Sequence, residues 1–382
     1  MQNIKTTLKS IKWKNYVNYI AVVLVLFFFL IYANTAGLKG STVVMLEKIS
    51  IGVILAVSLS LVVGFLGELS LGHAGFMCVG AYLGGKTAVL LEPVFGNSVI
   101  TFIISLVLGG ICAAVCGGII GLPALRLRGD YLAIVTLAFG EIVKVIFRQS
   151  EIFGGNLGLE TPRFVRSSCY IICLIMVLIT LAVVQNLIHS SHGRAITSIR
   201  DNEIAARATG IPVTKYKLYA FIVSAFFAGI AGVLFSFTNN TIHSSEFDYN
   251  YSIEILVMVV LGGMGNINGS IISAALITFI NTGLQTSLTG NFAVLKDLFY
   301  ALILIVLVIY NNAPMLKGFR EKYNIKNLFN RIFKKRNDPA EIRDDAASWG
   351  RIPTKINMDE VLSVDIVKTD EHTSQNGEGG ND

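Results

Sequence analysis

Few residues in this sequence are spaced for chemistry, and the clearest polar group lies in the segment GELSLGHAGF. It places Glu68, Ser70 and His73 among glycines between two apolar runs. A carboxylate, a hydroxyl and an imidazole at a break in a hydrophobic segment can line a polar route, because ionisable groups beside such segments usually serve a function. The alternative is structural: the glycines permit close helix approach and a reversal, while Glu68 and His73 reach water. Both interpretations stay open.

A second glycine-rich segment, GGMGNINGS, follows a short apolar run and supplies the candidate route residues Gly263, Gly265, Asn266 and Gly269. It resembles the first segment in type, with clustered glycines, a short polar insert and a helix of small residues. Interruptions at corresponding places in two halves indicate an internal repeat with a site between them. The repeat is weak. Gly265 and Gly269 also form a GxxxG pattern, which helix packing alone would explain.

Two further patterns point to chemistry that their context does not favour. GAYLGGKT, from Gly80 to Thr87, matches a phosphate-binding loop, but such a loop needs a preceding strand, and this match lies inside an apolar run. The pairs Cys112/Cys116 and Cys169/Cys173 are each one helical turn apart, with no His or carboxylate on the same face, so we interpret them as small hydrophobes. No metal or nucleophile constellation assembles, and the chain is predicted not to be an enzyme and to hold no cofactor itself.

The composition sets the elements that must position these residues. Of the 382 residues, 53% are hydrophobic and only 15% charged. Apolar runs of about 17 to 25 residues recur, each long enough as a helix to cross roughly 30 Å of hydrocarbon. We therefore predict an all-α fold, a polytopic membrane helix bundle of about ten spans with broken or short helices. The spans are expected near 17–33, 49–66, 74–91, 98–121, 131–147, 169–188, 216–238, 252–263, 268–287 and 294–311.

Charge predicts the orientation and the domain limits. The loops and ends rich in Lys and Arg all fall on one side of a ten-span bundle, and such loops are cytoplasmic. Both termini are then cytoplasmic: a segment 1–16 precedes the transmembrane domain 17–311, and a tail 312–382, basic and then acidic, is expected to be disordered. The eighth span is too short to cross straight, so we expect a half-helix there, with LGGMGNINGS as a candidate cavity wall.

Of the charged residues within the predicted spans, Glu141, Lys144 and Glu254 can be interpreted from their spacing. Glu141 and Lys144 are three apart, so they share a helix face and form a candidate intramembrane polar pair. A position at the membrane interface explains this pair as well as a role in a pathway does. Glu254 comes shortly after Ser252, and we expect it to be a first-turn acid facing the positive end of its helix.

The most informative segment is SHGRAITSIRDNEIAARATGIPVTKYK, which contains a predicted cytoplasmic loop, 192–215. It is long enough for a short helix on the membrane face. Ser198 and Asp201 are candidate N-caps, Glu203 and Arg207 form an i,i+4 pair, and Gly210 suits the position after the helix end. Alanines leave a low surface between the charges, which is suited to docking into a groove of a partner.

These residues resemble the permease family of bacterial branched-chain amino acid ABC importers, specifically its LivM-type subunits. The resemblance covers about 45–310. It rests on the order and spacing of the following segments: GELSLGHAGFMCVGAY, LRLRGDYLAIVTLAFGEIVKV, GRAITSIRDNEIAARATGIPVTKYKLYAFIVSAFFAGIAGVLFS and SIEILVMVVLGGMGNINGS. It implies a multi-pass protein of the bacterial cytoplasmic membrane that forms half of a translocation pathway.

The resemblance also implies partners: a second, LivH-like permease, two cytoplasmic ATPase subunits that carry ATP and Mg, an extracytoplasmic substrate-binding protein and an amino acid cargo, with no nucleic acid. The ATPase-docking loop of the family maps onto Arg200, Asp201, Asn202, Glu203, Ala206 and Gly210. The broader importer signature has Glu-Ala-Ala before its Gly, whereas Ile204, Ala205 and Ala206 occupy those places here. The last predicted span also ends in YNNAPMLKG, where relatives carry an Arg-Pro-x-Gly-Leu-type ending.

Other functions stay open beside this one. The same machine could import urea, short amides, a sugar or a nucleoside, since related permeases share the layout. A secondary transporter driven by an ion gradient is an alternative from another class, and a membrane-embedded enzyme is a third. A small apolar cargo needs only a shaped cavity and backbone groups, which leave no motif in a sequence.

Overall fold

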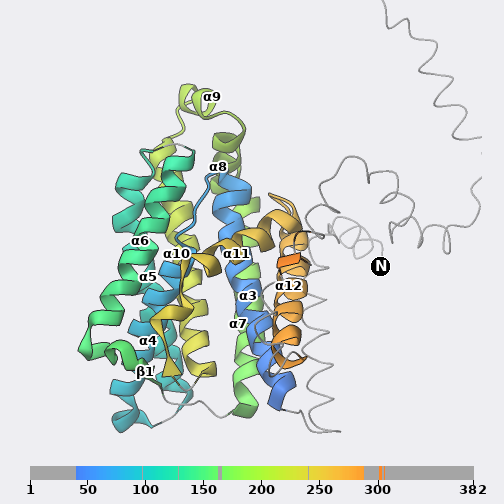
Figure 1. Cartoon of the computed structure of the whole chain (residues 1–382). Coiled ribbons are helices and arrows are strands. Elements are labelled where there is room, and N and C mark those ends of the chain that lie inside the picture. The colour runs from blue at the N-terminus through green and yellow to red at the C-terminus, as the bar shows by residue number, and fades with distance from the viewer. Residues whose placement is uncertain are drawn as a thin grey trace, which may run out of the picture. The chain divides into compact units, whose positions relative to one another are not determined.

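A computed structural model describes residues 40–96, 98–127, 129–161, 166–239 and 241–287, together with residues 301, 302 and 305 (Figure 1). The predicted segment 1–16, the first predicted span, nearly all of the last one and the tail 312–382 lie outside these ranges. The described helices are α3 (Gly40–Ser60), α4 (His73–Phe95), α5 (Val99–Ala124), α6 (Asp130–Gln149), α7 (Arg166–His189), α8 (Ser191–Asp201), α9 (Glu203–Ala208), α10 (Val213–Thr238), α11 (Tyr249–Gly262) and α12 (Ile267–Ser287).

Short elements complete these ranges. A π-helical segment, Leu61–Leu66, extends α3, and single 3-10 turns lie at Glu151–Phe153, Gly155–Leu157 and Ser244–Glu246. Strands β1 (Leu159–Glu160) and β2 (Thr241–Ile242) form one antiparallel pair, with Leu159 opposite Ile242. This pair lies at the end of the bundle opposite α8 and α9 (Figure 1).

The predicted all-α membrane bundle is confirmed. Among the described residues, six helices are long and apolar enough to cross a membrane: Gly40–Leu66, His73–Phe95, Val99–Ala124, Cys169–His189, Val213–Thr238 and Ile267–Leu284. The predicted fifth span corresponds to α6, which is outside that set because Glu141, Lys144 and further charges fall within it. The predicted eighth span is α11, whose 14 residues reach only about 21 Å, as its short apolar run indicated.

Glycines set the close packing of α4, α5 and α10 at the centre of the bundle. A Cβ at Gly80 would lie 2.2 Å from the carbonyl oxygen of Gly229, and a Cβ at Gly109 would lie 2.3 Å from Val233. No larger residue fits either place without moving a helix. The segment GAYLGGKT is helical throughout within α4. Its first glycine therefore serves helix packing.

Two helices start in the interior of the bundle. The N–H of Leu71 donates to Thr136 Oγ1 at 3.0 Å, and a Cβ at Gly75 would lie 2.7 Å from the Cα of Gly140, so α4 begins beside the middle of α6. α11 begins at the same depth, because the N–H of Ala74 donates to Ser252 Oγ at 3.1 Å. The connections 67–72 and 241–248 thus enter from opposite ends of the bundle and lead to helix starts that meet (Figure 1).

Candidate functional site

The predicted docking loop folds into two short helices, α8 and α9, at one end of the bundle. Ser190 Oγ accepts from the N–H of Gly193 and begins α8, while Asn202 Oδ1 accepts from the N–H of Ala205 and begins α9. The predicted caps were wrong: Ser198 donates to the carbonyl of Ala195 within α8, and Asp201 is the last residue of that helix. The loop forms two helices because Asn202 is extended, with φ −159° and ψ 103°.

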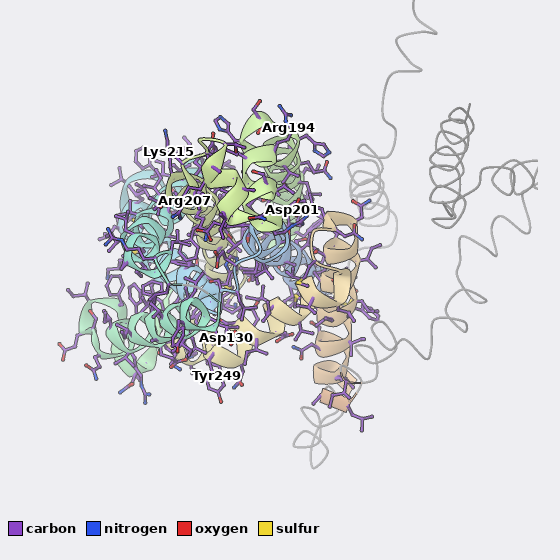
Figure 2. All side chains as sticks on the ribbon, turned by 90° about the horizontal axis from the view of Figure 1, so that it is seen from above. Asp130, Arg194, Asp201, Arg207, Lys215 and Tyr249 are labelled. Carbon is purple, nitrogen blue, oxygen red and sulfur yellow. The ribbon has the colours of Figure 1, made fainter. Side chains whose placement is uncertain are left out.

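Other features of this loop are as predicted. Glu203 and Arg207 form their i,i+4 ion pair at 3.0 Å. Gly210 follows the end of α9 with φ +85°, a conformation that favours glycine. Ala206 is buried and holds α9 against the bundle, whereas Ile204 is 78% exposed. Seen from above, Arg194, Asp201, Arg207 and Lys215 gather over this end of the molecule (Figure 2).

Arg200 joins α8 to the π-helical segment that extends α3 and to the turn between α11 and α12. Its Nη1 donates to the carbonyl of Gly64, in the π-helical segment, at 3.0 Å, and its other nitrogens bind Asp201. The same Nη1 would lie 3.2 Å from a Cβ at Gly265, in the turn between α11 and α12. Gly64 itself packs on that turn, since a Cβ on it would lie 2.6 Å from the N of Gly265. One guanidinium therefore contacts the end of α3 and the end of α11.

The second glycine-rich segment lies beside this arginine. Gly262 and Gly269 are in close contact, because a Cβ at Gly269 would lie 1.8 Å from the carbonyl oxygen of Gly262. Gly263 and Gly265 both have positive φ, and the N–H of Asn266 donates to the carbonyl of Gly263 at 3.0 Å. Of the candidate route residues, Gly263, Gly265 and Asn266 thus form a tight turn at the α8 end of the bundle, and Gly269 lies in the first turn of α12.

Glu68 lies in a cluster of charges that the sequence did not reveal. Lys217, from α10, contacts Glu68 Oε1, and its Nζ is 3.2 Å from Glu203 Oε2. Arg207 binds the other oxygen of Glu203. The side chain of Lys217 is only 5% exposed. These four residues, hereafter the Lys217 cluster, balance two carboxylates with two cations and tie the 67–72 connection to α9 and α10.

Ser70 and His73 lie deeper, along the connection that leads to α4. His73 is buried, and its Nε2 is 2.8 Å from Ser58 Oγ. Because that hydroxyl donates to the carbonyl of Leu55, the ring nitrogen is the donor in this contact. Ser70 is also buried, and its hydroxyl has no hydrogen-bond partner among the described residues. The break predicted at this segment is present, and it brings His73 next to the meeting point of α4 and α11.

The polar pair of α6 has a structural contact with α11. Lys144 Nζ lies 2.5 Å from Glu141 Oε2, as the spacing predicted, and Glu141 Oε1 accepts from the N–H of Tyr249 at 3.1 Å. The expected role of Glu254 was wrong. α11 begins at Tyr249 with Asp248 as its N-cap, so Glu254 lies in the second turn, where it accepts from Asn281 Nδ2 at 3.0 Å.

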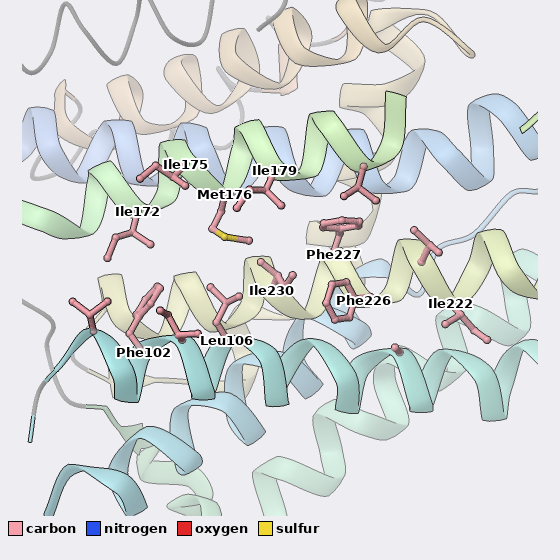
Figure 3. A pocket seen from close by; sticks show the side chains of 15 residues that line it. Phe102, Leu106, Ile172, Ile175, Met176, Ile179, Ile222, Phe226, Phe227 and Ile230 are labelled. Atoms are coloured by element: carbon pink, nitrogen blue, oxygen red, sulfur yellow. The ribbon is translucent and has the colours of Figure 1, made fainter. Parts of the chain in front are cut away.

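Two cavities of different chemistry open among the helices. One, of about 670 Å³, lies between α5, α7 and α10, and the described residues that line it all have apolar side chains (Figure 3). None of these residues offers a side-chain hydrogen bond to a polar solute. The other, of about 460 Å³ and hereafter the charged cavity, lies toward the β1–β2 end. It is lined by Lys48, Ile51, Met77, Phe235, Ser245, Glu246, Phe247, Asp248, Tyr251, Glu254, Met258, Thr278, Asn281 and Thr282.

Comparisons with known proteins agree with this architecture. Residues 41–309 match the family described as branched-chain amino acid transport system, permease component. The chain is 33% identical over 308 residues to the high-affinity branched-chain amino acid transport system permease protein LivM of Salmonella typhimurium and of Escherichia coli, covering 72% of this chain and 70% of each relative.

A more distant relative carries another cargo in its name. The chain is 26% identical over 287 residues to the ribose import permease protein RbsC of Escherichia coli, which covers 70% of this chain and 84% of that protein. No solved structure matches the chain. Since the family match and the LivM relatives each cover most of the described helices, this chain belongs to the permease component family of branched-chain amino acid transport systems.

Proposed function

We propose that this chain is one of two permease subunits of an ATP-driven importer for leucine, isoleucine and valine. Its partners would be a second, LivH-like permease, two ATPase subunits that hold ATP and Mg, and an extracytoplasmic substrate-binding protein. The family match and the 33% identity to LivM proteins support this cargo. The chain itself would perform no chemistry and carry no cofactor.

The end that carries α8 and α9 would face the cytoplasm. Cationic side chains concentrate there, and cationic loops remain on the cytoplasmic side of a bacterial membrane. Among the described residues, the exposed cations of this end are Arg126, Arg194, Arg200, Arg207 and Lys215. The β1–β2 end would then face the substrate-binding protein. The chain would lie in the bacterial cytoplasmic membrane with both termini inside.

One observation supports the coupling role best: α8 and α9 contact the residues that lead into α4 and the turn that follows α11. Arg200 joins α8 to Gly64 and to the α11–α12 turn. Lys217 and Glu203 join α9 to Glu68, at the start of the connection to α4. Closure of the ATPase pair would move α8 and α9 as one piece, and these contacts would pass the motion to the connection before α4 and to the turn after the C-terminal end of α11.

On the outer face of α9, Ile204 would insert into a groove of the ATPase, flanked by Asp201 and Arg207. An exposed isoleucine between opposite charges suits a hydrophobic contact with a polar rim. Among the predicted docking residues, Ala206 would support α9 from below, because it is buried. Asn202 and Gly210 would fix the limits of that helix.

The test is uptake of labelled leucine into vesicles that contain the complete set of subunits, with and without ATP on the α8 side. We expect uptake to require ATP and every subunit, and isoleucine and valine to compete. Ile204→Asp should abolish ATP-coupled uptake, whereas Ile152→Asp, on an exposed isoleucine in the 3-10 turn that follows α6, should leave ATPase docking intact. Leucine uptake by this chain alone, abolished by an ionophore and indifferent to ATP, would overturn the proposal.

Ribose should be tested as a second cargo in the same experiment, because the RbsC relative is named as a ribose import permease. Ribose import by the same subunits would keep the coupling mechanism and replace the cargo. Ribose is neutral and polar, so an excess of unlabelled ribose should not lower leucine uptake. Competition by ribose, or ATP-dependent uptake of labelled ribose in place of leucine, would contradict the amino acid cargo.

A further inference from the structure

The charged cavity combines three kinds of surface that rarely meet inside a membrane protein. Among the described residues that line it are one cation, Lys48 on α3, and three acids, Glu246, Asp248 and Glu254. Its apolar lining includes Ile51, Met77 and Met258, which are 2%, 0% and 2% exposed. Opposite charges above a buried apolar floor suit a small ligand that has both charges and an apolar side chain.

The acidic residues that line this cavity make different hydrogen bonds. Asp248 uses one oxygen to cap α11 through the N–H of Tyr251 and the other to accept from Asn250, so its role is structural. Glu254 is oriented by Asn281 Nδ2 at 3.0 Å. Glu246 lies at the exposed mouth, where its Oε2 accepts from the N–H of His243. Glu246 and Glu254 are therefore the carboxylates placed to meet a cationic group of a ligand.

An unsatisfied hydroxyl provides an independent sign of a binding site. Thr278, which lines the cavity, is 9% exposed, and its Oγ1 has no hydrogen-bond partner in the described part of the chain. Gly52 makes room for this hydroxyl, since a Cβ there would lie 2.6 Å from it. A buried hydroxyl without a partner costs free energy, and a polar ligand group would satisfy it.

The cavity also reaches the depth at which the starts of α4 and α11 meet. Met77 is one turn into α4, and Tyr251 is next to Ser252, whose hydroxyl accepts from the N–H of Ala74. Its mouth, at Ser245 and Glu246, lies in the connection between β2 and α11. A ligand in this cavity would lie between the β1–β2 end and the point where α4 and α11 start.

We propose that the charged cavity is a stopping site for an α-amino acid on its way through the membrane. The α-ammonium group meets Glu246 and Glu254, the α-carboxylate meets Lys48, and the apolar side chain lies on Ile51, Met77 and Met258. The inference rests on the proposed function, because it takes the cargo class from there. It adds what that function leaves open, namely where in this chain both charges of the cargo are compensated.

The test is protection of a cysteine at the cavity mouth from a water-soluble thiol reagent. Ser245→Cys is placed in the assembled permease pair with its ATPases, without nucleotide and without the substrate-binding protein, and labelling is measured against added leucine. We expect leucine to protect Ser245→Cys in a saturable way. Leucinamide, which lacks the carboxylate, and 4-methylpentanoate, which lacks the ammonium group, should not protect it.

Two variants then connect protection to the named charges. Glu254→Gln keeps an oxygen to accept from Asn281 and removes only the charge, and Lys48→Met removes the cation. Loss of a hydrogen bond to a charged group should raise the half-protecting leucine concentration by about 10- to 100-fold in each. Lys48→Arg should stay within about threefold of the parent, because it keeps the charge.

Controls separate this site from general effects and from the proposed function. Ser191→Cys, exposed at the start of α8, should label equally with and without leucine, and the parent complex measures labelling of the five native cysteines. If leucine fails to protect Ser245→Cys in a complex that imports leucine with ATP, the site is overturned and the function stands. If ribose protects it and is imported in place of leucine, both are overturned.

Discussion

The two ends of this permease treat their charges in opposite ways. At the α8 end, Glu68 and Glu203 are balanced by Lys217 and Arg207 in direct ion pairs, and Lys217 is almost fully buried. Toward the β1–β2 end, Lys48 and the carboxylates of Glu246 and Glu254 line an open cavity of about 460 Å³. The Lys217 cluster ties helices to one another, whereas the charges around the cavity border a space that a ligand can enter. The proposals above therefore give the two ends different roles, coupling at one and recognition at the other.

The largest expected effect comes from removing the cation at the closed end. Lys217→Met leaves Glu68 and Glu203 close together without their shared counter-charge, and breaking a buried ion pair costs about 3–5 kcal/mol. We expect the complex to lose thermal stability and ATP-coupled uptake. Differential scanning fluorimetry of the purified complex and vesicle uptake of leucine measure the two losses.

Lys215→Met is the matched control, since Lys215 is exposed and two residues away on the same helix. Adding Glu68→Gln and Glu203→Gln to Lys217→Met should recover part of the stability, because no uncompensated carboxylate then remains. A Lys217→Met complex as stable as the parent would show that the Lys217 cluster does not hold the helices together, and the contrast between the two ends would fail.

A smaller effect is expected from Arg200, which connects α8 to Gly64 but is itself exposed. Arg200→Lys keeps the charge but cannot reproduce the guanidinium fork that binds both Asp201 and the carbonyl of Gly64. The loss of a hydrogen bond from a charged donor should lower the leucine transported per ATP hydrolysed by about 10-fold, with ATPase activity retained. Arg194→Lys is the control, since the side chain of Arg194 donates to His189 and Ser191, which both lie within five residues of it. An unchanged ratio in Arg200→Lys would remove this arginine from the coupling route.

The smallest expected effect is a pH dependence at the open end. Burial raises the pKa of Glu246, while its bond from His243 and the charge of Lys48 oppose that rise. A raised pKa means that Glu246 becomes neutral at a higher pH than an ordinary glutamate as the pH falls, so its attraction for an ammonium group is lost earlier. We expect the half-protecting leucine concentration for Ser245→Cys to rise about two- to fivefold as the pH falls through this titration. A change of this size corresponds to the free energy of an exposed ion pair.

Glu246→Gln provides the comparison for this titration. It should show the weaker protection at every pH and a flatter profile. Asp248→Asn is unsuitable as a control because Asp248 caps α11. An identical pH profile in the parent and Glu246→Gln would assign the titration to another group and remove Glu246 from the ligand contact.

The sequence predicted local features well and distant contacts poorly. The bundle, the short eighth span, the Glu203–Arg207 pair and the glycine after α9 depend on neighbours within a few residues, and all are present. The pairing of Glu68 with Lys217 joins positions 149 apart, and no spacing rule reaches that far. Ser198 and Asp201 were wrong as caps because Ser190 and Asn202 compete for the same role, and the tertiary contacts decide between them.

The charged cavity was not predicted from the sequence for a different reason. The predicted second span began at 49 and so left out Lys48, whereas α3 begins at Gly40 and places that lysine within the helix. Glu254 was assigned to a helix start because the preceding turn of α11 reads as loop, with its polar YNYS sequence. A lone lysine and a lone glutamate on separate helices carry no motif. Only the fold brings them to one cavity.

The shared starting depth of α4 and α11 also has a consequence for ions. Each helix presents its N-terminal end there, and such an end carries roughly half a positive charge. Asp248 offsets the end of α11, but the residue before α4 is Gly72, which has no side chain to do the same. Positive ends of interrupted helices repel protons and metal cations in membrane pores. A carrier with this arrangement can admit a solute of zero net charge and still preserve the electrical potential across the membrane in which it works.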